Sequence, residues 1–269
     1  MLTTKARVAK TVRRVRQRLT GMRGHAVPAF VLGAQRSGTN MLMDVLGRCP
    51  YVEAFNETDP EAFDHYRLKP PASLVALVER SFARVALFKP ICDSQKARVL
   101  LDVFPDGKVV WIYRDYRDVV NSALRQFQDH TKYLHYVLHE PDVAGWRLEN
   151  VSDKSLDLVR QFHARGIDDA SARALIWVLR NEQFFQNELD SDDRAMLVRY
   201  ESLVQDPATE FEALFRFLDL PFDPSCVLRV SPHSINKHAS PDIHPEIAAL
   251  CADMTARLDR RRSAGPARR

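Results

Sequence analysis

The amino-acid sequence predicts an α/β fold, a single three-layer domain in which a largely parallel sheet is flanked by helices. Short apolar runs typical of buried strands alternate with helical patterns along the chain. The 269 residues suffice for one such domain, and no long Gly/Ser/Pro tract interrupts the alternation. We expect this domain to span residues 29–256, with a basic amphipathic segment before it (1–28) and a basic disordered tail after it (257–269).

The predicted elements follow one another in a regular order. The predicted strands are residues 29–32, 52–55, 85–88, 109–113 and 195–199. Apolar residues at helical spacing predict helices over residues 39–48, 74–82, 94–103, 119–124, 171–188 and 211–218. Residues 128–170 are polar and irregular, and no element is assigned to them. Since ligands sit at the carboxyl ends of the strands in such sheets, the functional residues are expected there.

A glycine-containing loop follows the first predicted strand. The apolar run ends at Gly33, and the polar residues 34–40 lead directly into a helix, so that backbone N–H groups can surround an anion at the helix N-terminus. The spacing resembles the phosphate loop of nucleotide triphosphatases, G-x-x-x-x-G-K-[ST], and predicts a P-loop nucleotide-hydrolase-like sheet. However, Thr39 stands in the lysine position, and Arg36 supplies a positive charge three residues earlier. This argues against magnesium-dependent γ-phosphate chemistry and for another group transfer beside a phosphate.

Charged residues follow the next strands as well. Glu57 comes after the second predicted strand, Lys89 after the third and Arg114 after the fourth. Because parallel strands end at a common edge, we expect these side chains to converge with Arg36 in one crevice.

The net charge of +4 is distributed unevenly. Residues 1–24 carry eight Lys/Arg and no acid, and residues 257–269 carry six Arg and one Asp, which leaves −9 on residues 25–256. A nucleic-acid-binding body is therefore not indicated. The four cysteines are scattered without a C-x-x-C pair, which indicates reduced thiols in a cytoplasmic protein. Neither these cysteines nor His233, His238 and His244 have metal-ligand spacing, so no metal site is expected.

The N-terminal segment has the pattern of an amphipathic helix. Its apolar face would comprise Val8, Val12, Val15, Leu19 and Met22, with basic residues around the rest. Such a helix suits peripheral contact with an anionic membrane through residues 1–24, and a solvated or partner-packed helix is the open alternative. No apolar core of a signal peptide follows the charges.

Four segments together resemble sulfotransferases that use 3′-phosphoadenylyl sulfate (PAPS). Residues 35–40 (QRSGTN) are similar to the family's 5′-phosphosulfate loop, and residues 113–122 (YRDYRDVVNS) to its 3′-phosphate motif. Residues 88–90 (FKP), before a helix that ends in Phe104-Pro105, resemble the lysine-proline element. Residues 198–207, with Phe217-Leu218, resemble the later tyrosine-glutamate signature. The similarity covers residues 29–222.

The resemblance implies a set of donor-binding residues. The loop would hold the phosphosulfate, and Arg114 with Ser122 would bind the 3′-phosphate through charge-assisted hydrogen bonds. The product would be 3′-phosphoadenosine 5′-phosphate (PAP), and the scheme requires no metal. The residues implied to bind the donor are Arg36, Ser37, Gly38, Thr39, Asn40, Arg114, Ser122, Tyr200 and Lys237.

The implied catalytic residues are Arg36, Glu57 and Lys89. Arg36 would stabilise charge on the departing phosphate oxygen. Glu57 would be the general base, as proposed for a comparable glutamate in tyrosylprotein and some carbohydrate sulfotransferases; Glu53 is the lesser rival, and a capping carboxylate is the structural alternative. Lys89 either reaches the phosphosulfate or covers a strand end.

Two further assignments stay open. Tyr200 either contacts the nucleotide or packs behind the sheet, and Lys237 either closes over the donor or is an ordinary surface lysine. The predicted function is therefore transfer of a sulfuryl group from PAPS to a hydroxyl of an unidentified acceptor, such as a carbohydrate, a glycolipid or another small molecule. A P-loop kinase or a non-catalytic nucleotide-binding protein is the alternative. Residues 58–72, 128–170 and 231–245 are expected to line the acceptor side.

Overall fold

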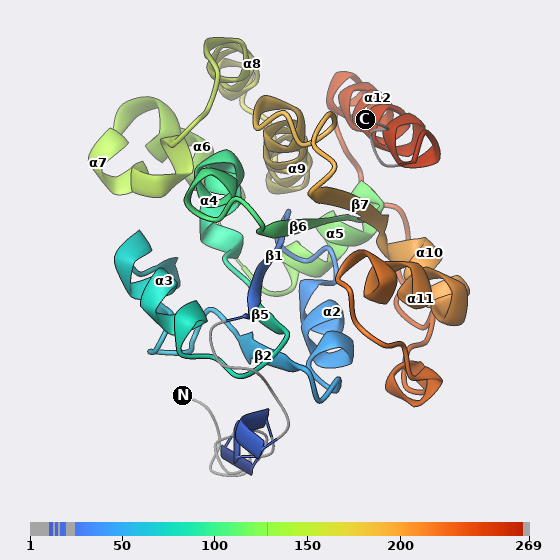
Figure 1. The fold of residues 1–269 in the computed structure, drawn as a ribbon. Coiled ribbons are helices and arrows are strands. Elements are labelled where there is room, and N and C mark those ends of the chain that lie inside the picture. Colours follow the sequence, from blue (N-terminus) through green and yellow to red (C-terminus); the bar gives the residue numbers. More distant parts are fainter. Residues whose placement is uncertain (1–10, 13, 16, 20–24, 128, 266–269) are drawn as a thin grey trace.

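The computed structural model describes residues 11–12, 14–15, 17–19, 25–127 and 129–265. Five parallel strands form the central sheet in the order β2-β5-β1-β6-β7, and β3 pairs with β4 in a separate antiparallel hairpin (Figure 1). The strands are β1 (Val27–Gly33), β2 (Val52–Phe55), β3 (Phe63–Asp64), β4 (Arg67–Leu68), β5 (Val85–Phe88), β6 (Lys108–Tyr113) and β7 (Ala195–Arg199).

Helices connect the strands and cover both faces of the sheet (Figure 1). The α-helices are α2 (Thr39–Leu46), α3 (Pro71–Glu79), α4 (Ala97–Val103), α5 (Tyr116–Leu124), α6 (His130–His139), α7 (Pro141–Ala144), α8 (Asp153–Ala164), α9 (Asp169–Gln186), α10 (Tyr200–Gln205), α11 (Pro207–Phe217) and α12 (Pro245–Ser263). Short 3₁₀ helices are η1 (Ile91–Lys96), η2 (Gly145–Leu148) and η3 (Pro224–Val227). The predicted three-layer α/β fold is thereby confirmed.

Alternate side chains of each strand point into two separate cores. On β1, Phe30 and Leu32 pack toward α4 and α9, whereas Ala29 and Val31 pack toward α2 and α11. Both sides of the strand are buried, which explains why it reads as a continuous apolar run rather than an alternating one. The sheet therefore places the polar loop after β1 between two packed layers.

The order of the strands creates a switch point at β1. The chain leaves β1 for β2 on one side, returns through β5, and then crosses to β6 and β7 on the other side. The loop after β1 consequently lies between the carboxyl ends of β5 and β6, in the position where ligands bind in open α/β sheets.

Two sequence-based expectations about segments need correction. Residues 128–170, expected to be irregular, contain α6, α7, η2 and α8. The basic tail expected to be disordered from residue 257 is helical up to Ser263, because α12 continues into it: Leu258 is fully buried and Arg257 forms an ion pair with Glu182 at 2.8 Å. The sequence pattern did not reveal this continuation because arginines surround Leu258, the buried apolar residue of the last turns.

The N-terminal segment lies partly outside the described residues, including Val8 and Met22. Where it is described, its polar side contacts the domain: Arg14 pairs with Glu53 and Glu61, and Gln17 donates to the carbonyl oxygen of Pro50 at 2.8 Å. The side chains of Val12, Val15 and Leu19 are exposed. Within the described ranges no helix combines the length and apolar character needed to cross a bilayer.

Candidate active site

The loop between β1 and α2 has a backbone that only particular residues allow. Gly38 has φ +100°, and a Cβ added there would lie 2.3 Å from Cδ2 of Tyr200. Arg36 also has a positive φ, 73°, which is uncommon for a residue other than glycine. Ser37 is fully buried, and its Oγ has no hydrogen-bond partner among the described residues. A buried hydroxyl without a partner suits a loop whose remaining hydrogen bonds are made to a ligand.

Arg36 and Ser122 are brought together by the fold. Nε of Arg36 donates to Oγ of Ser122 at 2.9 Å, although the two residues are 86 positions apart. The sequence assigned them to opposite ends of a bound donor. The structure shows that the β1 loop and the first helix after β6 share one site.

Lys89 lies at the end of β5 and is almost fully buried. Its Nζ contacts Oδ1 of Asn40 in α2 and lies 2.9 Å from Oε2 of Glu57. The Lys89 amine thus lies between an amide oxygen of α2 and the carboxylate of Glu57.

The two candidate bases occupy different environments. Glu57 keeps 28% of its side chain exposed beside Lys89. Glu53 is buried within β2, where it binds Arg14 at 2.5 Å and accepts a hydrogen bond from Oγ of Ser81 at 2.6 Å. Only Glu57 lies with the other predicted residues at the carboxyl ends of the strands.

Arg114 occupies the end of β6 and is also buried. Its guanidinium stacks 4.4 Å above the ring of Tyr200, lies 3.2 Å from Oδ2 of Asp118, and donates to the carbonyl oxygen of Ser234. Nε of Arg114 has no hydrogen-bond partner in the described part of the chain. Together with Ser37 Oγ, this leaves two unsatisfied buried donor groups at one edge of the sheet, which fits an anionic ligand.

Tyr200 links the two sides of the site. Its ring lies between Gly38 and Arg114, and its hydroxyl shares a hydrogen bond with Oγ of Ser234. The ring is therefore buried between the loop after β1 and the end of β6. Lys237, by contrast, is exposed and forms no ion pair or hydrogen bond with the described residues.

The segment around Lys237 is nevertheless fixed over α5. The backbone N–H of Asn236 donates to Oδ2 of Asp118 at 3.2 Å, and Nδ2 of Asn121 donates to the carbonyl oxygen of Ala239 at 2.9 Å. These contacts hold the loop beside Arg114 without placing the Lys237 amine in the site.

Arg173 on α9 is a component that the sequence did not reveal. It is buried and donates from Nη2 to the carbonyl oxygen of Gln35, at 2.9 Å. Burial, followed by the nearby charges of Arg180 and Arg36, lowers the pKa of Arg173 to about 10. The available signal was a pair of arginines seven residues apart, Arg173 and Arg180, within the apolar pattern of this helix.

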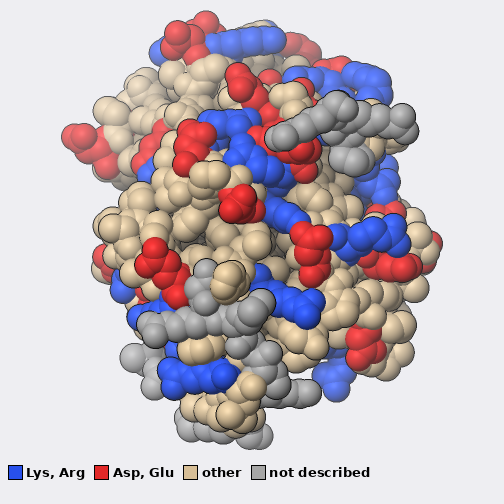
Figure 2. All heavy atoms as spheres, in the orientation of Figure 1, with Lys and Arg blue, Asp and Glu red and all other residues tan. Residues whose placement is uncertain are grey.

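Charges of both signs are interspersed on the face drawn in Figure 2. This face shows no continuous basic surface of the kind that tracks a nucleic-acid backbone. The positive charges of the candidate site are instead the buried or partly buried groups at the strand ends, such as Lys89 and Arg114.

A family model described as "Sulfotransferase domain" matches residues 28–242. The chain belongs to the sulfotransferase domain family. It is thus an enzyme of sulfuryl transfer, and the resemblance seen in its four sequence segments is confirmed.

One solved structure supports the fold of this sulfotransferase. A sulfotransferase from Alicyclobacillus acidocaldarius has 17% sequence identity and a TM-score of 0.51, and the match covers 90% of this chain and 96% of the other. The sulfotransferase domain of the Synechococcus PCC 7002 olefin synthase has 18% identity and a TM-score of 0.46, with 88% and 94% covered. No curated protein has significant sequence similarity to the chain.

Proposed function

We propose that this sulfotransferase moves a sulfuryl group from PAPS to an acceptor hydroxyl and releases PAP. The observation that carries the proposal is the joining of two predicted phosphate sites through Arg36 and Ser122, whose side chains are hydrogen-bonded at 2.9 Å. A donor with phosphates at both its 3′ and 5′ positions needs two cationic sites linked in this way.

Donor binding would use the groups whose hydrogen bonds are unfilled. Ser37 Oγ and the N–H groups at the start of α2, including those of Thr39 and Asn40, would hold the 5′-phosphosulfate. Arg114 Nε would hold the 3′-phosphate. Ser122 Oγ, which accepts a hydrogen bond from Arg36, would donate one to the same phosphate. Tyr200 would act indirectly, by holding Gly38 and the Arg114 guanidinium in position.

The reaction would be an in-line displacement at sulfur. The acceptor oxygen forms a bond to sulfur while the bond between sulfur and the bridging oxygen of the 5′-phosphate breaks, and the acceptor proton passes to Glu57. Negative charge then grows on the bridging oxygen, where Arg36 would stabilise it. Arg36 would have to break its hydrogen bond to Ser122 and form one to this oxygen.

Lys89 would connect the base and the donor. Its ammonium group is 2.9 Å from Glu57 and also contacts Asn40 in the helix that follows the loop. A sulfuryl group arriving beside Asn40 would compete with Glu57 for this charge. Movement of Lys89 toward the donor would release the Glu57 carboxylate to accept the proton of the acceptor hydroxyl.

For the acceptor we propose only a chemical class. We infer a small-molecule hydroxyl, and a glycolipid is favoured only insofar as the N-terminal segment contacts membranes. Support for such contact comes from the exposed side chains of Val12, Val15 and Leu19 in a segment rich in basic residues.

Calorimetric titration with PAP, AMP and ATP, with and without Mg²⁺, tests the donor assignment. We expect magnesium-independent PAP binding that weakens by about ten- to hundredfold in Arg114→Ala, because one charge-assisted contact is lost. Arg229→Ala, which removes an exposed arginine, should bind PAP as the wild type does. Equal affinity for AMP and PAP, or a preference for Mg²⁺-ATP, would instead favour a kinase or a plain nucleotide-binding protein.

A further inference from the structure

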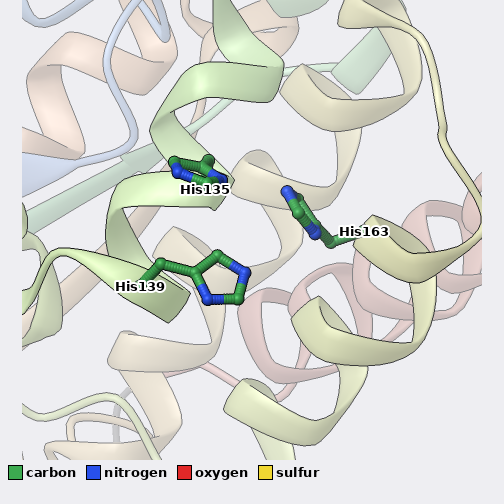
Figure 3. Close-up of side chains that lie close together, drawn as sticks. All are labelled: His135, His139 and His163. Atoms are coloured by element: carbon green, nitrogen blue, oxygen red, sulfur yellow. The ribbon is translucent and has the colours of Figure 1, made fainter.

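Three histidines meet between α6 and α8, outside the residues assigned to sulfuryl transfer. His135 and His139 extend from α6 and His163 extends from α8, and all three rings point toward one shared space (Figure 3). The distances between ring centroids are 4.8 Å, 5.7 Å and 5.5 Å for the pairs 135–139, 135–163 and 139–163.

The spacing of these histidines suits a metal ion. His135 and His139 are four residues apart, so they lie on the same face of the helix, one turn apart. One ligand atom from each of the three side chains can be chosen so that all lie within 4.8 Å of one another. Nitrogen–zinc bonds are about 2.0–2.1 Å long. Small rotations of the rings, which shift each nitrogen by about 1 Å, would therefore bring three nitrogens within bonding distance of one ion.

A carboxylate lies beside the cluster. The carboxylate of Glu140 is 3.6 Å from Nε2 of His135, where it can orient that ring.

We propose that His135, His139 and His163 bind one divalent transition-metal ion of the imidazole-preferring class, represented by Zn²⁺. A set of three nitrogens suits zinc, nickel or copper rather than magnesium or calcium, which prefer oxygen ligands. His135 and His139 are exposed, so the ion can enter from solvent and keep water at its fourth position.

The ion would connect two helices that sequence patterns alone did not predict. α6 and α8 belong to the segment between α5 and α9, and a metal bridge would fix them to each other. Its role would therefore be structural, and the proposed sulfuryl transfer would still need no metal. The four-residue spacing of His135 and His139 was the signal for this site, and neither the cysteines nor His233, His238 and His244 share it.

Titration of tag-free protein with ZnCl₂, followed by calorimetry, tests the site. We expect one equivalent of Zn²⁺ per chain for the wild type and for His25→Ala, which removes an exposed histidine elsewhere. His139→Gln and His163→Gln should weaken binding by at least the roughly 10–100-fold that loss of an outer partner costs. Far-UV circular dichroism would confirm that these two variants fold.

A second measurement locates the ion independently of affinity. Hydrogen exchange of the α6 and α8 amides should slow when Zn²⁺ is added to the wild type and should not change in His163→Gln. The proposal would be overturned if the wild type did not bind Zn²⁺ stoichiometrically, or if the two glutamine variants bound Zn²⁺ as tightly as the wild type does. Neither result depends on PAPS, so it would leave the proposed sulfuryl transfer untouched.

Discussion

The ammonium group of Lys89 lies 2.9 Å from the carboxylate of Glu57, and both residues sit at the carboxyl ends of neighbouring strands. In the proposed reaction, the bound sulfuryl donor is an anion that would compete with Glu57 for the Lys89 ammonium group. Donor binding would therefore change the contacts of the proposed base.

Replacing Glu57 by Gln should remove the base and leave the donor site intact. We expect kcat to fall by about 10²–10⁴, with little change in PAP affinity. Steady-state transfer kinetics and PAP calorimetry measure the two effects separately. Glu53→Gln is the matched control, since it breaks the contacts to Arg14 and Ser81 and should lower thermal stability rather than kcat. Equal losses of kcat in the two variants would rule out Glu57 as the specific base.

Replacing Gly38 by Ala should disrupt the donor loop. The new Cβ would lie 2.3 Å from the Tyr200 ring, at a backbone φ of +100° that alanine rarely adopts. We expect PAP affinity to fall at least about tenfold and stability by about 1–3 kcal/mol. Gly166→Ala is the control, because φ is +68° there but nothing lies within 4 Å of the added carbon. If both variants bind PAP equally, the contact between Gly38 and Tyr200 does not shape the loop.

The strands and the loop between β1 and α2 could be predicted because their signals are local. Residues 52–55, 85–88 and 195–199 are strands with the predicted bounds, since each is a short and mainly apolar segment. Arg36, Glu57, Lys89 and Arg114 could be placed at one edge because a parallel sheet collects its strand ends there.

The parts that could not be predicted depend on contacts between distant residues. Residues 130–164 include α6, α7, η2 and α8, in which polar residues are interspersed with the apolar ones, and their packing against α9 stabilises them. Nothing in the sequence indicates that Arg173 contacts Gln35, which is 138 residues away. The hydrogen bond between Arg36 and Ser122 likewise arises only when β1 and β6 are adjacent.

Asp192 should make stability depend on pH in acid. Hydrogen bonds from Arg194, with a further one from Arg98, hold the pKa of this carboxyl well below its usual range. A lowered pKa in the folded state means that the stabilisation is full above the unfolded pKa of about 3.9 and is lost as the pH falls through the folded value.

Asp192→Asn should therefore lower the free energy of unfolding at pH 7 by about 1.5–3 kcal/mol, and the difference from the wild type should shrink below about pH 4. Urea unfolding at several pH values measures it. Asp157→Asn, which removes an exposed pair with Arg160, should have little effect at any pH. A deficit for Asp192→Asn that is constant from neutral to strongly acidic pH would contradict this account.

The N-terminal segment should bind anionic lipid. We expect the protein to float with phosphatidylserine-containing liposomes, and serine substitutions at Val12, Val15 and Leu19 should reduce the floated fraction, because these side chains are exposed in a basic segment. Serine substitutions at the exposed Val99, Val143 and Leu228 provide a matched control. Equal flotation of the two triple variants would refute membrane contact through this segment.

The hydrogen bond from Arg173 to the carbonyl oxygen of Gln35 fixes the donor loop from a helix that belongs to the core. The loop is thus preorganised: its unusual backbone is stabilised by folding and need not be ordered when the donor arrives. Binding free energy that would otherwise be spent on ordering the loop remains available for affinity. A residue of a core helix can therefore influence how tightly this loop binds a ligand.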